Sequence, residues 1–272
     1  MIGAAKSRIG KAWLLFREID LMIRTLCAGF AALLATPAVA VAQDEKPVSI
    51  VLVHGAFVDG SGWKGVYDRL TRDKYEVLVV QNSTETLDGD VEATRRVIAA
   101  ARHPVVLVGH SYGGAVITEA GEDPKVRSLV YLAAFAPEVG ESVLALAEKP
   151  HPGETGAPLL PPAEGYLLVD PAKFPSAFAA DVDLSTTRFM AAAQVPWGLK
   201  ATQTPLTKAA WKAKPTSFLL TTQDHMIPPS IQRMMATRTK GKVTEIRSSH
   251  AVMLSHPDAV TTFIVAAATA TK

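Results

Sequence analysis

With 272 residues, of which 48% are hydrophobic and 20% charged, the chain holds enough apolar side chains for a sizeable core, which excludes an intrinsically disordered protein. The formal net charge of +2 combines about +3 in residues 1–42 with about −1 in the rest of the chain, so we predict neither nucleic acid nor an anionic membrane surface as a partner. Cys27 is the only cysteine, which excludes an intrachain disulfide and a thiolate metal site.

The N-terminal residues differ from the rest of the chain. Five basic and two acidic residues lie within residues 1–24, and no further charge follows until Asp44. The apolar stretch 26–41 is too short to span a bilayer comfortably, and Ala40-Val41-Ala42 has the small-x-small pattern of a signal-peptidase site. We therefore predict a cleaved signal peptide over residues 1–42.

The mature chain would then comprise residues 43–272, be exported to the periplasm or the medium, and keep no stable membrane anchor. Two alternatives remain open for the apolar stretch: an uncleaved anchor, or a buried core helix. Met22 stands where a signal peptide of ordinary length would begin, so residues 1–21 could come from an upstream start codon.

From residue 48 onward, short β-branched runs alternate with longer amphipathic stretches, which is typical of βα units in a parallel sheet. Six buried strands are predicted, at residues 48–53, 75–80, 104–108, 126–132, 216–221 and 242–246. Five helices are predicted, at residues 62–72, 90–102, 112–121, 229–239 and 257–270. The predicted fold class is α/β, with one doubly wound, mostly parallel sheet.

The alternation is interrupted at residues 136–212. This segment holds ten of the eighteen prolines, which excludes a continuation of the sheet. It also holds six large aromatic residues: Tyr166, Phe174, Phe178, Phe189, Trp197 and Trp211. We interpret it as an inserted helical cap that covers the pocket and supplies aromatic walls. The alternative is an insertion that packs far from the chemistry.

The strongest motif is Gly109-His110-Ser111-Tyr112-Gly113, between the predicted strand 104–108 and the predicted helix 112–121. In a G-x-S-x-G turn from strand to helix, the serine backbone is strained and Oγ is exposed at the carboxyl edge of the sheet. The flanking glycines lack the Cβ atoms that would clash in such a turn. A chance Gly-Ser-Gly turn is disfavoured by the strand and helix on either side. Ser111 is therefore the candidate nucleophile.

The first predicted strand ends in His54-Gly55-Ala56-Phe57. Acyl transfer requires two donors aimed at the tetrahedral oxygen, and a glycine turn here can point the amide of Ala56 into the same space as that of Tyr112. We predict these two amides as the oxyanion hole. His54 is a possible base, but we interpret it as a structural histidine that braces the turn.

A serine hydroxyl needs a base and an acid, which in this architecture follow in the order Ser, acid, His at strand ends. Asp224 follows the predicted strand 216–221 and is the candidate acid. His250 follows the predicted strand 242–246 and is the candidate base. The ends of these two strands should meet above Ser111.

Other histidines and acids fit less well. His225 adjoins Asp224, and a base there would point away from the acid on a turn. His110, inside the elbow, should face the core, whereas Asp181 and Asp183 lie in the cap and should be solvated. Since no His, Asp or Glu cluster has metal spacing and no Gly-rich phosphate cradle is present, we predict neither a metal nor another cofactor.

Four motifs occur together in the predicted mature domain: Val53-His54-Gly55-Ala56 with Gly62-Trp63; Gly109 to Gly114; Asp224 with Ile227-Pro228-Pro229; and Ser249-His250. With them the chain resembles the α/β-hydrolase superfamily, in the branch of plant methyl-ester esterases, hydroxynitrile lyases and many bacterial esterases. The resemblance covers most of the mature domain, and the cap is its least diagnostic part.

The resemblance implies a triad of Ser111, Asp224 and His250, the same set that the residues themselves indicate. It also separates two reactions, because the hydroxynitrile lyases have a threonine directly after the first-strand histidine and a lysine directly after the catalytic one. Here Gly55 and Ala251 stand at these positions, which disfavours cyanohydrin cleavage.

We therefore expect a serine carboxylesterase that cleaves small to medium-sized apolar esters through an acyl-enzyme. Phe57, Trp197 and Met226 are candidates for the pocket wall, although core packing explains them equally well. Two alternatives stay open: a non-catalytic small-ligand-binding protein on the same scaffold, or lactone opening, carbon–carbon bond hydrolysis or perhydrolysis by the same triad. The sequence predicts no oligomeric state.

Overall fold

The computed structural model describes residues 47–270, so the predicted signal peptide lies outside the described residues. A six-stranded parallel sheet forms the centre, in the order β2-β1-β3-β4-β7-β8. Its strands are β1 (Ser49–Val53), β2 (Glu76–Val80), β3 (Val105–His110), β4 (Val126–Leu132), β7 (Thr216–Thr221) and β8 (Lys242–Ile246). All six lie where the sequence predicts them, and the predicted fold class is confirmed.

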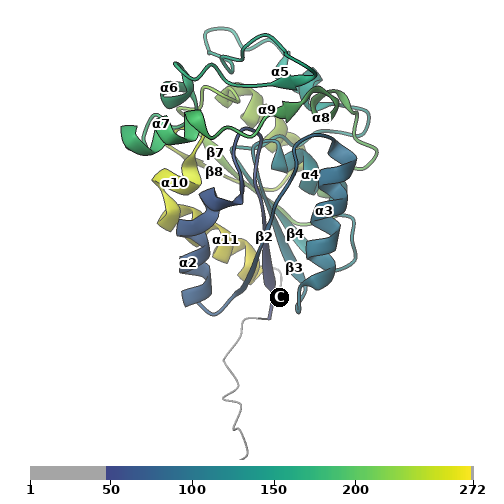
Figure 1. Cartoon of the computed structure of the whole chain (residues 1–272). Helices are drawn as coiled ribbons and strands as arrows, with labels where there is room; N and C mark the ends of the chain where they lie inside the picture. Colours follow the sequence, from purple (N-terminus) through teal and green to yellow (C-terminus); the bar gives the residue numbers. More distant parts are fainter. Residues whose placement is uncertain (1–46, 271–272) are drawn as a thin grey trace, which may run out of the picture. The chain divides into compact units, whose positions relative to one another are not determined.

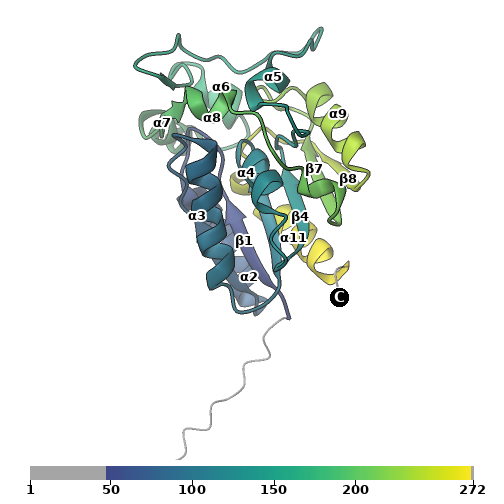
Figure 2. The same cartoon turned by 90° about the vertical axis from the view of Figure 1, so that its right-hand side faces the viewer.

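Helices cover both faces of this sheet (Figures 1 and 2). The five predicted helices are present as α2 (Lys64–Arg72), α3 (Leu87–Ala100), α4 (Gly113–Ala120), α9 (Pro229–Thr239) and α11 (Pro257–Ala270). Successive strand residues point to opposite faces. Val51 and Leu107 therefore pack in the core under α3, α4 and α9, whereas Leu52 and Val106 pack in the core under α2 and α11.

The prediction of six buried strands is wrong for β8. Four of its five residues are exposed, and Val243 keeps 43% of its surface in contact with solvent. β8 is the edge of the sheet and pairs with β7 alone. The other edge strand, β2, is only partly buried except at Val80. An edge strand has a neighbour on one side only, which leaves its side chains less covered.

The segment between β4 and β7 forms the cap. It contains α5 (Val143–Ala147), β5 (Tyr166–Leu167), α6 (Phe174–Phe178), α7 (Leu184–Ala192), β6 (Trp197–Gly198), α8 (Leu199–Gln203) and the 3-10 turn η2 (Ala210–Lys212). Figures 1 and 2 show these elements gathered over one end of the sheet. Contacts of Trp197 with Phe57 and Tyr112, which follow β1 and β3, identify that end as the carboxyl end of the strands.

Two short elements outside the cap complete the fold: η1 (Gly60–Trp63) after β1 and α10 (Val252–Ser255) before α11. None of the helices in residues 47–270 is both long and apolar enough to cross a membrane.

Candidate active site

The strained turn expected around Ser111 is present between β3 and α4. Ser111 has φ 54°, in the left-handed region that side chains with a Cβ rarely adopt. Its carbonyl oxygen accepts from the amide of Phe135 at 3.1 Å, which fixes the turn. A Cβ added to Gly109 would lie 2.6 Å from the carbonyl oxygen of Gly113, so glycine is required there. Ser111 is 8% exposed.

The loop after β1 runs directly against this turn. A Cβ added to Gly55 would lie 2.6 Å from the Cβ of Ser111. Within residues 47–270, neither the amide of Ala56 nor that of Tyr112 donates a hydrogen bond to another protein group. β1 and β3 are neighbours whose chains continue to opposite sides of the sheet, and ligands of open α/β sheets bind at such a switch point. Two unbonded donors are therefore available near Ser111.

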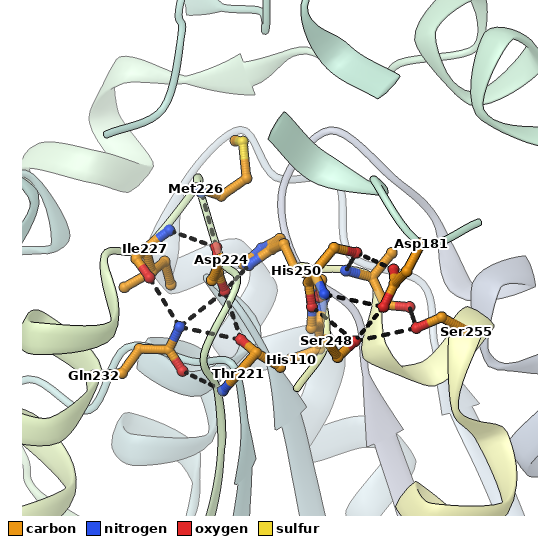
Figure 3. Close-up of polar contacts among 12 residues, drawn as sticks. His110, Asp181, Thr221, Asp224, Met226, Ile227, Gln232, Ser248, His250 and Ser255 are labelled. Carbon is orange, nitrogen blue, oxygen red and sulfur yellow. Dashed lines mark hydrogen bonds and ion pairs between the residues drawn. The ribbon is translucent and has the colours of Figure 1, made fainter. Parts of the chain in front are cut away.

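Asp224 and His250, which follow β7 and β8, are in direct contact (Figure 3). Nδ1 of His250 and Oδ2 of Asp224 are 2.8 Å apart, and both side chains are almost fully buried. In a neutral ring that donates from Nδ1, the lone pair is on Nε2. Within the described part of the chain this Nε2 has no hydrogen-bond partner. The His250 ring packs 4.6 Å from that of His110, the residue before Ser111.

Further groups hold the carboxylate of Asp224 from several sides. The amides of Met226 and Ile227 donate to Oδ1 at 2.8 and 2.9 Å. Thr221 Oγ1 and Gln232 Nε2 donate to Oδ2, each at 2.8 Å. Together with His250 these donors fix the orientation of Asp224.

The sequence analysis missed Gln232. This side chain is fully buried on α9, where it also accepts from the amide of Thr221 at 3.2 Å and donates to the carbonyl of Ile227 at 2.8 Å. It therefore ties the acid to the end of β7. The sequence signal that could have identified Gln232 is a polar residue on the inward face of the predicted helix 229–239.

His54 and His110 have structural hydrogen bonds. Nδ1 of His54 donates to the carbonyl of Gly55 at 2.8 Å, and Nε2 accepts from the amide of Asn82 at 2.9 Å. Burial lowers the pKa of His54, and protonation of Nε2 would break the bond from Asn82. Nε2 of His110 lies 2.9 Å from the carbonyl oxygen of His250, and burial lowers the pKa of His110 well below its usual value. His54 therefore braces the loop after β1.

His225 lies away from the acid. Its side chain is exposed, and its Nδ1 is hydrogen-bonded to Thr155 Oγ1 at 2.5 Å. The arrangement leaves His250 as the histidine that contacts Asp224.

The candidate wall residues lie in different surroundings. The Phe57 and Trp197 rings meet edge to face at 5.5 Å, and Trp197 also packs 5.3 Å from the Tyr112 ring. The side chain of Met226 points away from Asp224 toward the cap (Figure 3). A cleft of about 310 Å³ borders Phe57, one residue beyond Ala56. Its other lining residues are Val58, Asp59, Ser61 and Gly62, Thr186, Phe189, Met190 and Ala193, and Leu254.

Comparison with known proteins identifies the family of this chain. The family model "Alpha/beta hydrolase family" matches residues 50–262. The chain belongs to the alpha/beta hydrolase family. A relative named "Alpha/beta hydrolase nvfD", from Aspergillus novofumigatus (strain IBT 16806), is 31% identical over 243 residues, which are 80% of this chain and 95% of that protein. The resemblance inferred from the motifs is confirmed.

Other relatives of this alpha/beta hydrolase are named as esterases. A "Carbendazim hydrolyzing esterase" from Nocardioides sp. (strain SG-4G) is 37% identical over 123 residues, 40% of this chain and 51% of that protein. A pyrethroid hydrolase from Sphingobium faniae JZ-2 has the same fold, with TM-score 0.71 and 23% identity over 82% of this chain and 98% of that one. The methylesterase MES16 from Arabidopsis follows at TM-score 0.67 and 20% identity, over 82% and 99%. The proteins similar to this chain are thus named as hydrolases or esterases.

A second buried carboxylate supports Tyr112 of the hydrolase. Tyr112 Oη donates to Asp90 Oδ2 at 2.8 Å, and Asp90 Oδ1 accepts from the amide of Thr84 at 3.0 Å. Thr84 in turn donates from Oγ1 to the carbonyl of Pro196 at 2.8 Å and accepts from the amide of Gly198 at 2.9 Å. Burial raises the pKa of Asp90. This chain of bonds links Tyr112 to β6 of the cap.

The prediction that Asp181 is solvated holds for the residue as a whole, which is exposed, but its carboxylate is also bonded to the His250 loop. Its side chain is 27% exposed, and Oδ2 accepts from Ser248 Oγ at 2.9 Å and from the amide of Ser249 at 3.0 Å. The reason is that the chain after α6 turns onto the loop that carries His250. Asp183 is also exposed and caps α7 by accepting from the amide of Thr186 at 2.9 Å.

Among residues 47–270, no three His, Cys, Asp or Glu side chains are grouped so that they could hold a metal ion.

Proposed function

We propose that this hydrolase is a serine carboxylesterase that cleaves carboxylic esters of small to medium-sized apolar substrates through an acyl-enzyme. The observation that carries the proposal is the Asp224–His250 pair, whose ring packs on the elbow that holds Ser111. The names "Carbendazim hydrolyzing esterase" and "methylesterase" of two similar proteins support an ester as substrate.

In the first half of the reaction, Nε2 of His250 accepts the proton of Ser111 as Oγ attacks the ester carbonyl carbon. Negative charge develops on the carbonyl oxygen, and the free amides of Ala56 and Tyr112 donate to it. Asp224 keeps the ring oriented and stabilises the imidazolium. His250 then gives the proton to the leaving alkoxide, which departs as an alcohol.

In the second half, water replaces the alcohol. His250 removes a proton from the water as it attacks the acyl-enzyme, and the same amides hold the new oxyanion. Collapse of this intermediate returns the proton to Ser111 Oγ and releases the carboxylic acid. No cofactor takes part in these steps.

The proposed substrate class follows from the cleft beside Phe57. Its lining is mostly apolar, and Asp59 is its one charged side chain among the described residues. An apolar acyl or alcohol group gains free energy by leaving water for such a surface, whereas a carboxylate would be repelled by Asp59.

The test is Ser111→Ala, assayed with p-nitrophenyl acetate and butyrate. We expect kcat to fall by roughly 10⁴- to 10⁶-fold while the circular dichroism spectrum stays unchanged. Labelling with a fluorophosphonate should add its phosphonyl group to the peptide that contains Ser111, and to no peptide in the variant. Turnover retained by the variant would exclude Ser111 as the nucleophile.

Assays of the same purified protein distinguish the proposed esterase from the alternative functions. Saturable binding without turnover across a panel of esters would favour a ligand-binding protein. Faster initial rates on lactones than on matched open esters would favour lactone opening by the same triad.

We also propose that the chain is exported after cleavage before Gln43. The measurement is N-terminal sequencing of protein recovered from the periplasm or medium of a host that expresses the full sequence. Protein that begins at Gln43 supports export, and an uncleaved cytoplasmic chain contradicts it.

A further inference from the structure

The loop that carries His250 is hydrogen-bonded on two sides, by different groups on each. The core binds two of its carbonyl oxygens: the amide of Gln223 donates to Ser248 at 3.0 Å, and the His110 ring donates to His250 at 2.9 Å. The cap binds two of its amides, which lie directly before and after His250. The loop is therefore held between the core and the cap.

The cap acceptors come from one short segment, residues 178–181. The amide of Ser249 donates to Oδ2 of Asp181 at 3.0 Å, and the amide of Ala251 donates to the carbonyl of Phe178 at 3.0 Å. The Phe178 ring also packs against the His250 ring at 4.8 Å, nearly perpendicular to it. Both the backbone and the ring of the histidine thus contact this segment.

Asp181 makes the larger share of these bonds (Figure 3). Besides the amide of Ser249, it accepts from the hydroxyls of Ser248 and Ser249, and both serines are almost fully buried. Ser248 Oγ also lies 3.1 Å from Ser255 Oγ, and His256 Nδ1 lies 3.6 Å from Asp181 Oδ2. Burial raises the pKa of Asp181, but the serine hydrogen bonds outweigh it and leave the pKa below its usual value. The bonds are therefore made to an ionised acceptor, which makes them shorter and stronger.

We propose that cap segment 178–181, with Asp181 as its anchor, positions the catalytic base: docking of the cap fixes the His250 loop so that the ring meets Asp224. Asp181 touches neither substrate nor the reacting atoms in this scheme, so it is a positioning residue. The proposal rests on the proposed function in that it takes His250 as the general base.

The consequence is that the cap does more than cover the pocket. Without the bonds from residues 178–181, the amide of Ser249 loses its acceptor, and the amide of Ala251 keeps only the long bond to Ser249 Oγ at 3.4 Å. A small displacement of a base from its working geometry lowers the rate by up to about 100-fold.

The first test compares Asp181→Asn with Asp183→Asn. Both change a cap aspartate to its nearest neutral isostere, and asparagine caps a helix as well as aspartate does. Asp183 bonds to Ser185 and Thr186 at the start of α7. For p-nitrophenyl butyrate we expect Asp181→Asn to lower kcat by about 10- to 100-fold with KM changed less than about threefold. Asp183→Asn should leave both within about twofold.

The second test needs no substrate. The proton on Nδ1 of His250, shared with Asp224, should give a far-downfield signal in the proton NMR spectrum of the purified protein. In Asp181→Asn we expect this signal to exchange with water at least about tenfold faster than in the wild type, because the loop opens more often. Asp183→Asn should keep the wild-type rate.

Unchanged kcat and unchanged proton exchange in Asp181→Asn would overturn the proposal. So would equal losses of kcat and melting temperature in both variants, since these would reflect general stability of the cap. If Asp181→Asn does not fold, Ser249→Ala removes one donor from the other side of the contact. It should lower kcat by about 3- to 10-fold and speed exchange, and wild-type values for both would overturn the proposal.

The two proposals can fail separately. A wild-type protein without ester turnover would contradict the proposed function, whereas the exchange of the His250 proton would still decide whether Asp181 holds the loop.

Discussion

At the scale of single residues, Tyr112 has two roles, one for its backbone amide and one for its side-chain hydroxyl. Its amide N–H has no hydrogen-bond partner among residues 47–270 and is proposed to bind the oxyanion, while its hydroxyl donates to Asp90 behind the elbow. Because Asp90 also binds the amide of Thr84, one buried carboxylate fixes the ring of the residue whose backbone amide is proposed as half of the oxyanion hole.

Replacement of Asp90 should separate its charge from its hydrogen bonds. Burial raises the pKa of this carboxyl group, so the ionised form is costly, and Asp90→Asn should change the free energy of unfolding by less than about 1 kcal/mol. Asp90→Ala leaves Tyr112 Oη and the Thr84 amide without an acceptor, and should cost about 1 to 3 kcal/mol for each. Urea unfolding at neutral pH measures both. Equal losses in the two variants would contradict this account.

Whether the sequence reveals the role of a residue depends, at this scale, on which side chains that residue contacts in the fold. Ser111, Asp224 and His250 each follow a strand within four residues, in the order Ser, acid, His that is typical of this architecture, so sequence reasoning can select them. Gln232 and Asp90 support them from within helices, and Tyr112 is 22 positions from its carboxylate. A polar residue on a helix looks the same in sequence whether it faces water or the candidate acid, so the sequence marks neither Gln232 nor Asp90.

At the scale of elements, β6 joins the cap to the core at Gly198. A Cβ added there would lie 2.2 Å from the carbonyl oxygen of Glu85, and the Gly198 amide donates to the carbonyl of Thr84 at 2.9 Å. This close approach also sets Trp197 against Phe57 and Tyr112.

Gly198→Ala should therefore push β6 away from residues 84–85. We expect a loss of about 1 to 3 kcal/mol in the free energy of unfolding, together with a red shift of tryptophan emission as Trp197 loses its packing. Gly156→Ala is the control, because the nearest atom to an added Cβ there is 3.4 Å away. Similar losses in both variants would show that the approach at Gly198 is not what docks β6.

The regular elements follow from the sequence more closely than the cap does. Continuous β-branched runs and 3.6-residue patterns place the sheet strands and the flanking helices within three residues of their bounds, because the central strands are buried on both faces and the helices on one. The cap has only short helices and a two-stranded pair. Its contacts with the core depend on single residues such as Gly198 and Asp181, and no periodic pattern marks these.

At the scale of the whole molecule, parallel strands bring four distant segments to one edge beneath the cap. Ala56 follows β1, Ser111 follows β3, Asp224 follows β7 and His250 follows β8. This convergence is a property of the parallel topology, and it made the site predictable before any side-chain contact was known.

The same edge buries two neutral histidines, which makes stability depend on pH. Burial lowers the pKa of His54 from 6.5, and lowers that of His110 well below it. Below about pH 6.5 the unfolded chain therefore binds more protons than the folded chain, and the free energy of unfolding falls as the pH falls toward the folded-state pKa values. Above that pH the contribution of both histidines is fully present.

Urea unfolding between about pH 7.5 and 5.5 measures this dependence. We expect a plateau at the upper end and then a decline that approaches about 1.4 kcal/mol per pH unit for each histidine. In His54→Gln, where the amide side chain can still donate and accept, the decline should fall to roughly half, since His110 alone then contributes. A flat profile in the wild type would mean that these rings take up protons without unfolding, and would contradict their assignment as neutral braces of the active-site edge.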